Sequence, residues 1–173
     1  GTGDWSSDVC SPISDAVLKD KSNQDTCMNA WCHGAPGIGL ARLCCLPYLD
    51  DVEIRTEINT ALNTTLSQGF GRNHSLCHGD LGNLELLLKA SQILDNPSCK
   101  TQVHRLTSII LESIEKHGCL CGVPLGVETP ALMTGIAGIG YQLLRLAEPE
   151  CIPSVLLLEP PKLDSKEFSK PKR

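Results

Sequence analysis

Two short stretches of the sequence share the pattern Cys-His-Gly-x-x-Gly, with their cysteines 45 residues apart. They are residues 32–37 and 77–82, and each leads into an apolar run typical of a buried helix. Thiolate sulfur and imidazole nitrogen are preferred zinc ligands, and a catalytic zinc ion usually takes three protein ligands and leaves the fourth position open. If the fold brings the two stretches together, Cys32, Cys77 and His78 supply two sulfurs and one nitrogen to such a site.

A zinc ion with one open position suits thiol chemistry. A thiol that binds there loses its proton at neutral pH and becomes a thiolate, which is a good nucleophile for conjugate addition. The alternative interpretation is that Cys32 and Cys77 are buried core residues whose histidine neighbours cap helices. The pattern occurs twice in the same register before Gly-x-x-Gly, which favours the metal site.

Three other polar residues lie near the motifs. His33 is predicted to line the mouth of the site rather than to bind the ion, because an open site needs only three protein ligands. His74 either lines the site or is a loop residue hydrogen-bonded to the backbone. Asp80 either accepts a hydrogen bond from His78 and so orients its ring, or is an acidic residue that suits a helix N-terminus.

The remaining cysteines fit other roles. Cys119 and Cys121 are too close together on one loop for a good tetrahedral pair, and we treat them as incidental. Because many of the ten cysteines lie in or beside helical patterns, we expect free or metal-bound thiols in a reducing cytosol. The six others are expected to be mainly small buried hydrophobic residues: Cys10, Cys27, Cys44, Cys45, Cys99 and Cys151.

The composition favours packed helices. Hydrophobic residues make up 41% of the 173 residues but aromatic ones only 3%, so the core must consist of Leu, Ile, Val and Ala. The net charge of −5 gives no electrostatic reason to expect a nucleic-acid or anionic-membrane partner. No apolar run approaches the roughly 20 residues that a membrane span needs.

Apolar and amphipathic runs alternate along the chain. The apolar runs at 38–46, 81–94 and 133–146 each accompany a Gly-x-x-Gly pattern, the third of which begins 56 residues after the second. The runs at 50–66 and 97–117 carry a single apolar stripe, the first capped by Asp50 and the second by Asn96. The unit is therefore a helical hairpin with an inner apolar and an outer amphipathic helix, which favours closure into an α/α barrel.

The two ends of the chain lack this pattern. Residues 1–26 are polar, and we expect a poorly ordered or non-native segment there. Residues 154–158 are predicted to be a short apolar, extended piece. Residues 162–173 contain five basic residues and are predicted to form a disordered tail.

The motifs resemble those of the lanthionine cyclase family. Residues 31–39 and 73–79 look like its zinc motifs, most closely those of the C-terminal cyclase (LanC-like) domain of class II lanthipeptide synthetases of the LanM type. Residues 153–161 resemble the end of these enzymes, so the resemblance covers about residues 27–161. It implies an α/α toroid of the six-hairpin barrel type, of which about the C-terminal half is present, and Zn²⁺ bound by Cys32, Cys77 and His78.

The resemblance also implies an activity. The family adds peptide cysteine thiols to dehydroalanine or dehydrobutyrine, which forms thioether rings in lanthipeptides (lantibiotics). The implied partner is a precursor peptide with a leader and dehydrated Ser and Thr residues, and the implied location is the bacterial cytoplasm. One alternative is a glutathione-binding lanthionine-synthetase-like protein, against which the ending at 153–161 argues. Another is a non-catalytic, glycosidase-like α/α module, which needs paired carboxylates where only Asp80 and Glu128 are available.

The chain departs from the family pattern in one important place. The general acid/base histidine of the family lies upstream of the first zinc cysteine, whereas this sequence has no histidine before His33. The resemblance also leads us to expect that the dehydratase domain and about half of the barrel are missing from this chain. We therefore expect a fragment of a parent cyclase that is inactive alone.

Overall fold

The computed structural model describes residues 28–161, and this part of the chain is helical, without a β-strand. The all-α prediction is therefore confirmed for the described range. The segments predicted to be poorly ordered, 1–26 and 162–173, lie outside the described residues. The elements are α1 (Ala35–Cys45), α2 (Val52–Gln68), α3 (Asp80–Ile93), α4 (Pro97–His117), the short 3₁₀ helix η2 (Pro124–Gly126) and α5 (Ile136–Ala147).

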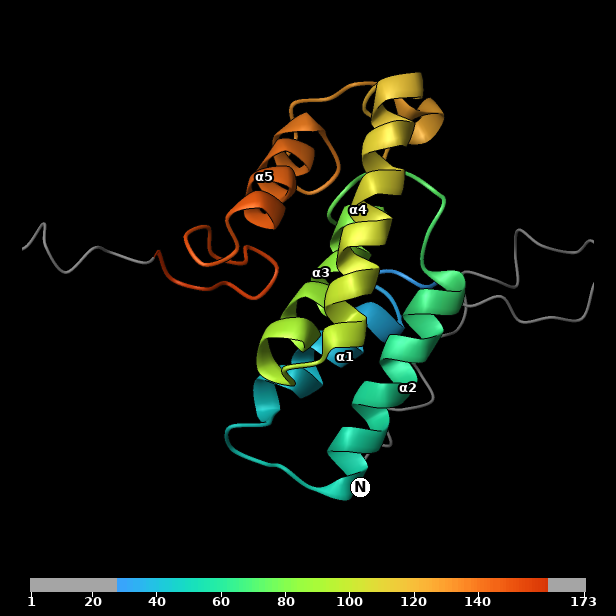
Figure 1. Cartoon of the computed structure of the whole chain (residues 1–173). Helices are drawn as coiled ribbons and strands as arrows, with labels where there is room; N and C mark the ends of the chain where they lie inside the picture. Colours follow the sequence, from blue (N-terminus) through green and yellow to red (C-terminus); the bar gives the residue numbers. More distant parts are fainter. Residues whose placement is uncertain (1–27, 162–173) are drawn as a thin grey trace, which may run out of the picture.

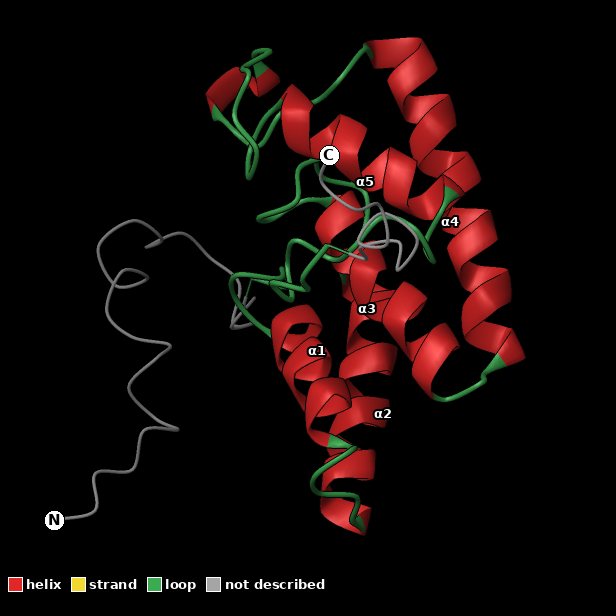
Figure 2. Cartoon of the chain, turned by 90° about the vertical axis from the view of Figure 1, so that its left-hand side faces the viewer, coloured by secondary structure: helices red, strands yellow, loops and turns green. Residues whose placement is uncertain are grey.

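The helices pack as successive hairpins. Helix α1 packs against α2, and α3 packs against α4 (Figures 1 and 2). The apolar helices also contact one another, with α3 between α1 and α5. This is the predicted arrangement of inner apolar and outer amphipathic helices, as in one arc of an α/α toroid. No helix in the described range is both long and apolar enough to cross a membrane.

Helix α3 is the centre of the core. Ten of its 14 residues are buried, including Leu81, Leu84 and Leu87, which are fully buried. The expectation of a buried helix is wrong for one side of α1, since its Ile38 is 53% exposed, and α5 also exposes apolar surface, with Leu144 61% exposed. The physical reason is that only α3 has an inner neighbour on both sides within the described range.

The N-cap of α4 is the residue predicted from the sequence, whereas that of α2 differs by one position. The N-cap of α2 is Asp51, whose carboxylate accepts a hydrogen bond from the Ile54 N–H at 2.8 Å. The prediction of Asp50 is wrong, because that carboxylate instead pairs with Arg55. Helix α4 begins as predicted, with the Asn96 side chain accepting hydrogen bonds from two N–H groups of the first turn.

Two further predictions need correction. Among the cysteines expected to be buried, Cys99 is buried and Cys45 is half-buried, but Cys44 on the outer side of α1 and Cys151 in the segment after α5 are exposed. Cys10 and Cys27 lie outside the described residues. Residues 155–158 form a turn rather than an extended piece, with the Leu158 N–H donating to the Val155 carbonyl at 3.3 Å.

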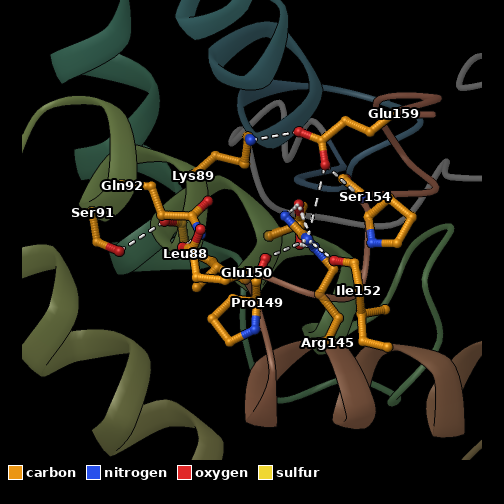
Figure 3. A network of polar contacts seen from close by, with 12 residues as sticks. Leu88, Lys89, Ser91, Gln92, Arg145, Pro149, Glu150, Ile152, Ser154 and Glu159 are labelled. Carbon is orange, nitrogen blue, oxygen red and sulfur yellow. Dashed lines mark hydrogen bonds and ion pairs between the residues drawn. The ribbon is translucent and has the colours of Figure 1, made fainter. Parts of the chain in front are cut away.

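A buried ion pair attaches α5 and the last described segment to α3. The Arg145 guanidinium contacts both carboxylate oxygens of Glu85, at 2.9 and 3.0 Å, and the Gln142 amide donates to the same carboxylate at 2.7 Å. Both charged side chains are at most 1% exposed. The other side of the guanidinium donates to the Ile152 carbonyl and lies 3.9 Å from the Glu159 carboxylate (Figure 3).

We expect Glu85→Ala to lower the free energy of unfolding by about 3–5 kcal/mol, because it leaves the buried Arg145 charge without its carboxylate partner. Urea denaturation followed by circular dichroism measures this change. The matched control is Glu112→Ala, which removes an exposed carboxylate paired with Lys116 and should leave the midpoint almost unchanged. Equal stability of the two variants would show that the buried pair has no special role.

Candidate metal centre

The loops that precede α1, α3 and α5 are joined edge to edge by backbone hydrogen bonds. The Cys32 N–H donates to the Cys77 carbonyl at 3.2 Å, and the Cys77 N–H donates to the Met133 carbonyl at 2.8 Å. These three residues occupy the same position in the three glycine motifs, two residues before the glycine that forms the N-cap of the following helix. The repeat therefore places equivalent residues of successive hairpins next to one another.

The second glycine of each motif allows an unusually close backbone contact. A Cβ atom on Gly82 would stand 1.8 Å from the Leu76 carbonyl oxygen, so no side chain fits there. The other two motifs make the same contact with the carbonyl oxygen six residues earlier. A Cβ atom on Gly37 would stand 2.1 Å from the Trp31 oxygen, and one on Gly138 would stand 1.7 Å from the Leu132 oxygen. The second glycine of each motif therefore serves the close approach of two backbone segments.

The fold brings Cys32, Cys77 and His78 together. Their ligand atoms, two Sγ and one ring nitrogen, all lie within 4.8 Å of one another. A tetrahedral zinc ion with Zn–S of about 2.3 Å and Zn–N of about 2.0–2.1 Å holds its ligands roughly 3.5–4 Å apart, so this donor set fits zinc. Cys32 is exposed and the other two are half-buried, so the cluster has a side open to an incoming ligand.

The thiol of Cys77 needs a cation to become a thiolate at neutral pH. Burial, together with the neighbouring Cys32 thiol, raises the pKa of Cys77 to about 11. At neutral pH this thiol therefore keeps its proton in the metal-free protein. Metal binding must displace the proton, which makes the affinity for the metal depend on pH.

His33 and His74 lie outside this cluster. His33 is exposed, and its backbone forms a two-way hydrogen-bonded bridge with Ala30. Its predicted place at the mouth of the site stays a prediction. His74 is only 2% exposed, and its Nδ1 accepts a hydrogen bond from the Leu120 N–H at 3.0 Å. In the neutral ring Nε2 therefore carries the hydrogen and donates to Ser113 Oγ, so the structure favours the loop residue hydrogen-bonded to the backbone.

Asp80 supports the loop before α3. Its carboxylate accepts hydrogen bonds from the N–H groups of Gly71 at 3.0 Å and Arg72 at 3.3 Å. Burial raises the pKa of this carboxyl, and the two amides offset part of that rise. Among the described residues no hydrogen bond joins Asp80 to His78, so the structure gives no support to a role for Asp80 in orienting the His78 ring. It instead favours the alternative, in which Asp80 is an acidic residue in the first turn of α3.

The loop after α4 forms a wall of the site that sequence reasoning missed. A hollow of about 420 Å³ opens beside His78 and is lined by Arg72, Asn73 and residues 120–126. Neither Cys119 nor Cys121 belongs to the cluster, and Cys121 is buried in the core, but Gly122 lies directly against the His78 ring. The only signal for this wall in the sequence was a glycine in a loop between two helical runs.

Comparison of the sequence with known proteins gives a family match and a relative. A family model described as lanthionine synthetase C-like protein matches residues 6–157. The chain is also 30% identical over 128 residues to the lacticin 481/lactococcin biosynthesis protein LcnDR2 of Lactococcus lactis subsp. lactis. That match covers 66% of this chain but only 14% of LcnDR2, so the chain spans a small part of the length of this relative.

The burial of His74 predicts a pH effect on stability. Burial lowers the pKa of this ring below its ordinary value, so as the pH falls below about 6.5 the unfolded chain takes up a proton that the folded chain resists. Stability should therefore fall from pH 7 towards the pKa of the folded state. Urea midpoints between pH 7 and pH 5 should fall less for His74→Gln than for the wild type, while the exposed His104→Gln keeps the wild-type slope.

Proposed function

The chain belongs to the lanthionine synthetase C-like family, and from that premise we propose that it carries the zinc-binding part of a lanthionine cyclase. The observation that carries the proposal is the meeting of Cys32, Cys77 and His78 from two loops that lie far apart in sequence. In this proposal these three residues hold Zn²⁺. When bound, the ion supplies the positive charge that turns a substrate thiol into a thiolate at neutral pH.

The proposed substrate is a peptide with a cysteine thiol and a dehydrated Ser or Thr residue. The thiol loses its proton, its sulfur bonds to the β-carbon of the dehydro residue as the Cα=Cβ double bond becomes single, and the α-carbon gains a proton. A thioether ring thus forms without a leaving group. The relative LcnDR2 is described as a biosynthesis protein for lacticin 481 and lactococcin, which supports a lanthipeptide precursor as the partner.

The chain's own residues account for the access of a substrate thiol to the cluster and for the fixed positions of the three ligands. The exposed Cys32 leaves one side of the cluster open, where a substrate thiol can approach. The hollow beside His78 is large enough for a segment of a peptide and is lined mainly by small and apolar residues with Arg72 and Asn73 among them. The motif loops hold the ligands in place before any substrate arrives, because their backbone groups bond to one another.

We expect the purified chain to bind one zinc ion, and Cys32→Ala and Cys77→Ala each to lose it. Zinc per chain is measured by inductively coupled plasma mass spectrometry after dialysis. Cys151→Ala, which removes an exposed thiol outside the cluster, should keep the full zinc content. A chain that is folded by circular dichroism but binds no zinc would refute the proposal.

We also expect zinc affinity to rise with pH. The high pKa of Cys77 keeps its proton in place until the metal displaces it. Because one proton is released, the zinc affinity should rise by about tenfold for each unit by which the pH rises, for each thiol that binds as a thiolate. Competition with a chromophoric chelator between pH 6 and 8 should show a steeper slope for the wild type than for Cys77→Ser. Equal slopes would mean that Cys77 does not bind the metal as a thiolate.

A further inference from the structure

The backbone of Gly122 lies against the ring of His78. A Cβ atom at this position would stand 2.8 Å from Nε2 and 3.0 Å from Cε1 of that ring, and 2.5 Å from Ser75 Oγ. Gly122 is not among the glycines with a left-handed backbone conformation. Its lack of a side chain therefore matters because of the space that the ring occupies, and not because of the backbone angles.

Gly122 is held in this place by the same network that holds the cluster. Its N–H donates to the Thr134 carbonyl at 2.7 Å, and the neighbouring carbonyl of Met133 accepts from the Cys77 N–H at 2.8 Å. On the other side of Gly122 the chain is tied down by His74, whose N–H donates to the Leu120 carbonyl at 2.8 Å. The loop is thus a fixed wall beside the imidazole.

Ser75 supplies a polar atom at the same point. Its side chain is fully buried, and its hydroxyl has no hydrogen-bond partner among the described residues. A buried hydroxyl without a partner is costly, so its presence needs a reason. The hydroxyl and the Nε2 edge of His78 border the same point in space, at 2.5 and 2.8 Å from the place where a Gly122 side chain would begin.

We propose that Ser75 and Gly122 are positioning residues for His78, an inference that rests on the proposed zinc function. A histidine that binds a metal through one ring nitrogen usually donates its other ring N–H to a nearby acceptor. The Ser75 hydroxyl has no partner among the described residues, and in this proposal it accepts that N–H in the zinc-bound protein. The bond formed there would fix which ring nitrogen faces the two cysteine sulfurs. Gly122 keeps the ring from turning away, because its backbone closes the space behind it.

Zinc affinity, measured on the full chain by competition with a chromophoric chelator, tests the proposal. We expect Ser75→Ala to weaken zinc binding by about 10–100-fold, the range usual for groups that orient a metal ligand. Gly122→Ala should weaken it by about tenfold or more and shift the visible absorption bands of the Co²⁺-loaded protein, because the displaced ring changes the coordination geometry.

Two matched controls separate positioning from packing. Ser154→Ala removes another buried hydroxyl without a partner, in the segment after α5. Gly140→Ala adds a Cβ atom on α5 that meets nothing within 4 Å. Both variants should bind zinc as the wild type does, and circular dichroism should show the same helix content in all four.

A double-mutant cycle decides whether Ser75 acts through His78. In the His78→Ala background, Ser75→Ala should have no further effect on zinc affinity. Two results would overturn the inference. One is wild-type zinc affinity in both Ser75→Ala and Gly122→Ala. The other is that Ser75→Ala lowers zinc affinity as much in the His78→Ala background as it does alone. If Gly122→Ala fails to fold, the Ser75 cycle decides alone.

Failure of the proposed function gives a different result. If the wild-type chain binds no zinc, the ring ¹⁵N chemical shifts of His78 in the metal-free protein still report its tautomer. Ser75→Ala should then change those shifts, whereas Ser154→Ala should not. Unchanged shifts in Ser75→Ala would overturn the positioning role independently of the metal.

Discussion

The site depends on one repeated backbone contact, in which the second glycine of each motif lies against the carbonyl six residues earlier. At Gly37, Gly82 and Gly138 a Cβ atom would stand at most 2.1 Å from that oxygen, so any other residue would force the loop and the helix apart. The contact folds each loop back over the first turn of its inner helix. It therefore gives the three loops the same shape, and loops of the same shape can bond edge to edge through Cys32, Cys77 and Met133.

Because the three loops have the same shape, the composition of the cluster depends on which residues occupy the equivalent positions. The first two motifs carry Cys-His at the equivalent positions, whereas the third carries Met133 and Thr134. The third loop therefore contributes backbone carbonyls to its neighbours but no side-chain ligand to the cluster. Within the described range, two loops with a cysteine beside one without give three candidate donors rather than a closed set of four, which fits the proposed zinc site with one position open to a substrate.

The repeat explains how much was predictable from the sequence. A pattern that recurs in register predicted the hairpins and the meeting of Cys32, Cys77 and His78, because equivalent positions become neighbours when hairpins stack. Contacts between non-equivalent segments carry no such signal. The burial of His74 under α4 and the approach of Gly122 to the His78 ring depend on how the loop after α4 crosses the motif, which no periodicity records.

The buried pair of Glu85 and Arg145 links the core to the site in the same physical terms. The carbonyls of Met133 and Thr134, which hold Cys77 and Gly122, immediately precede α5, so their position follows the docking of that helix. Helix α5 exposes much of its apolar surface and has α3 as its inner neighbour within the described range. Apolar contact alone is non-directional and would tolerate sliding along α3. The contact between a guanidinium and both oxygens of one carboxylate is directional, so it sets the register of α5 along α3. That register in turn places the Thr134 carbonyl, which holds Gly122 beside His78.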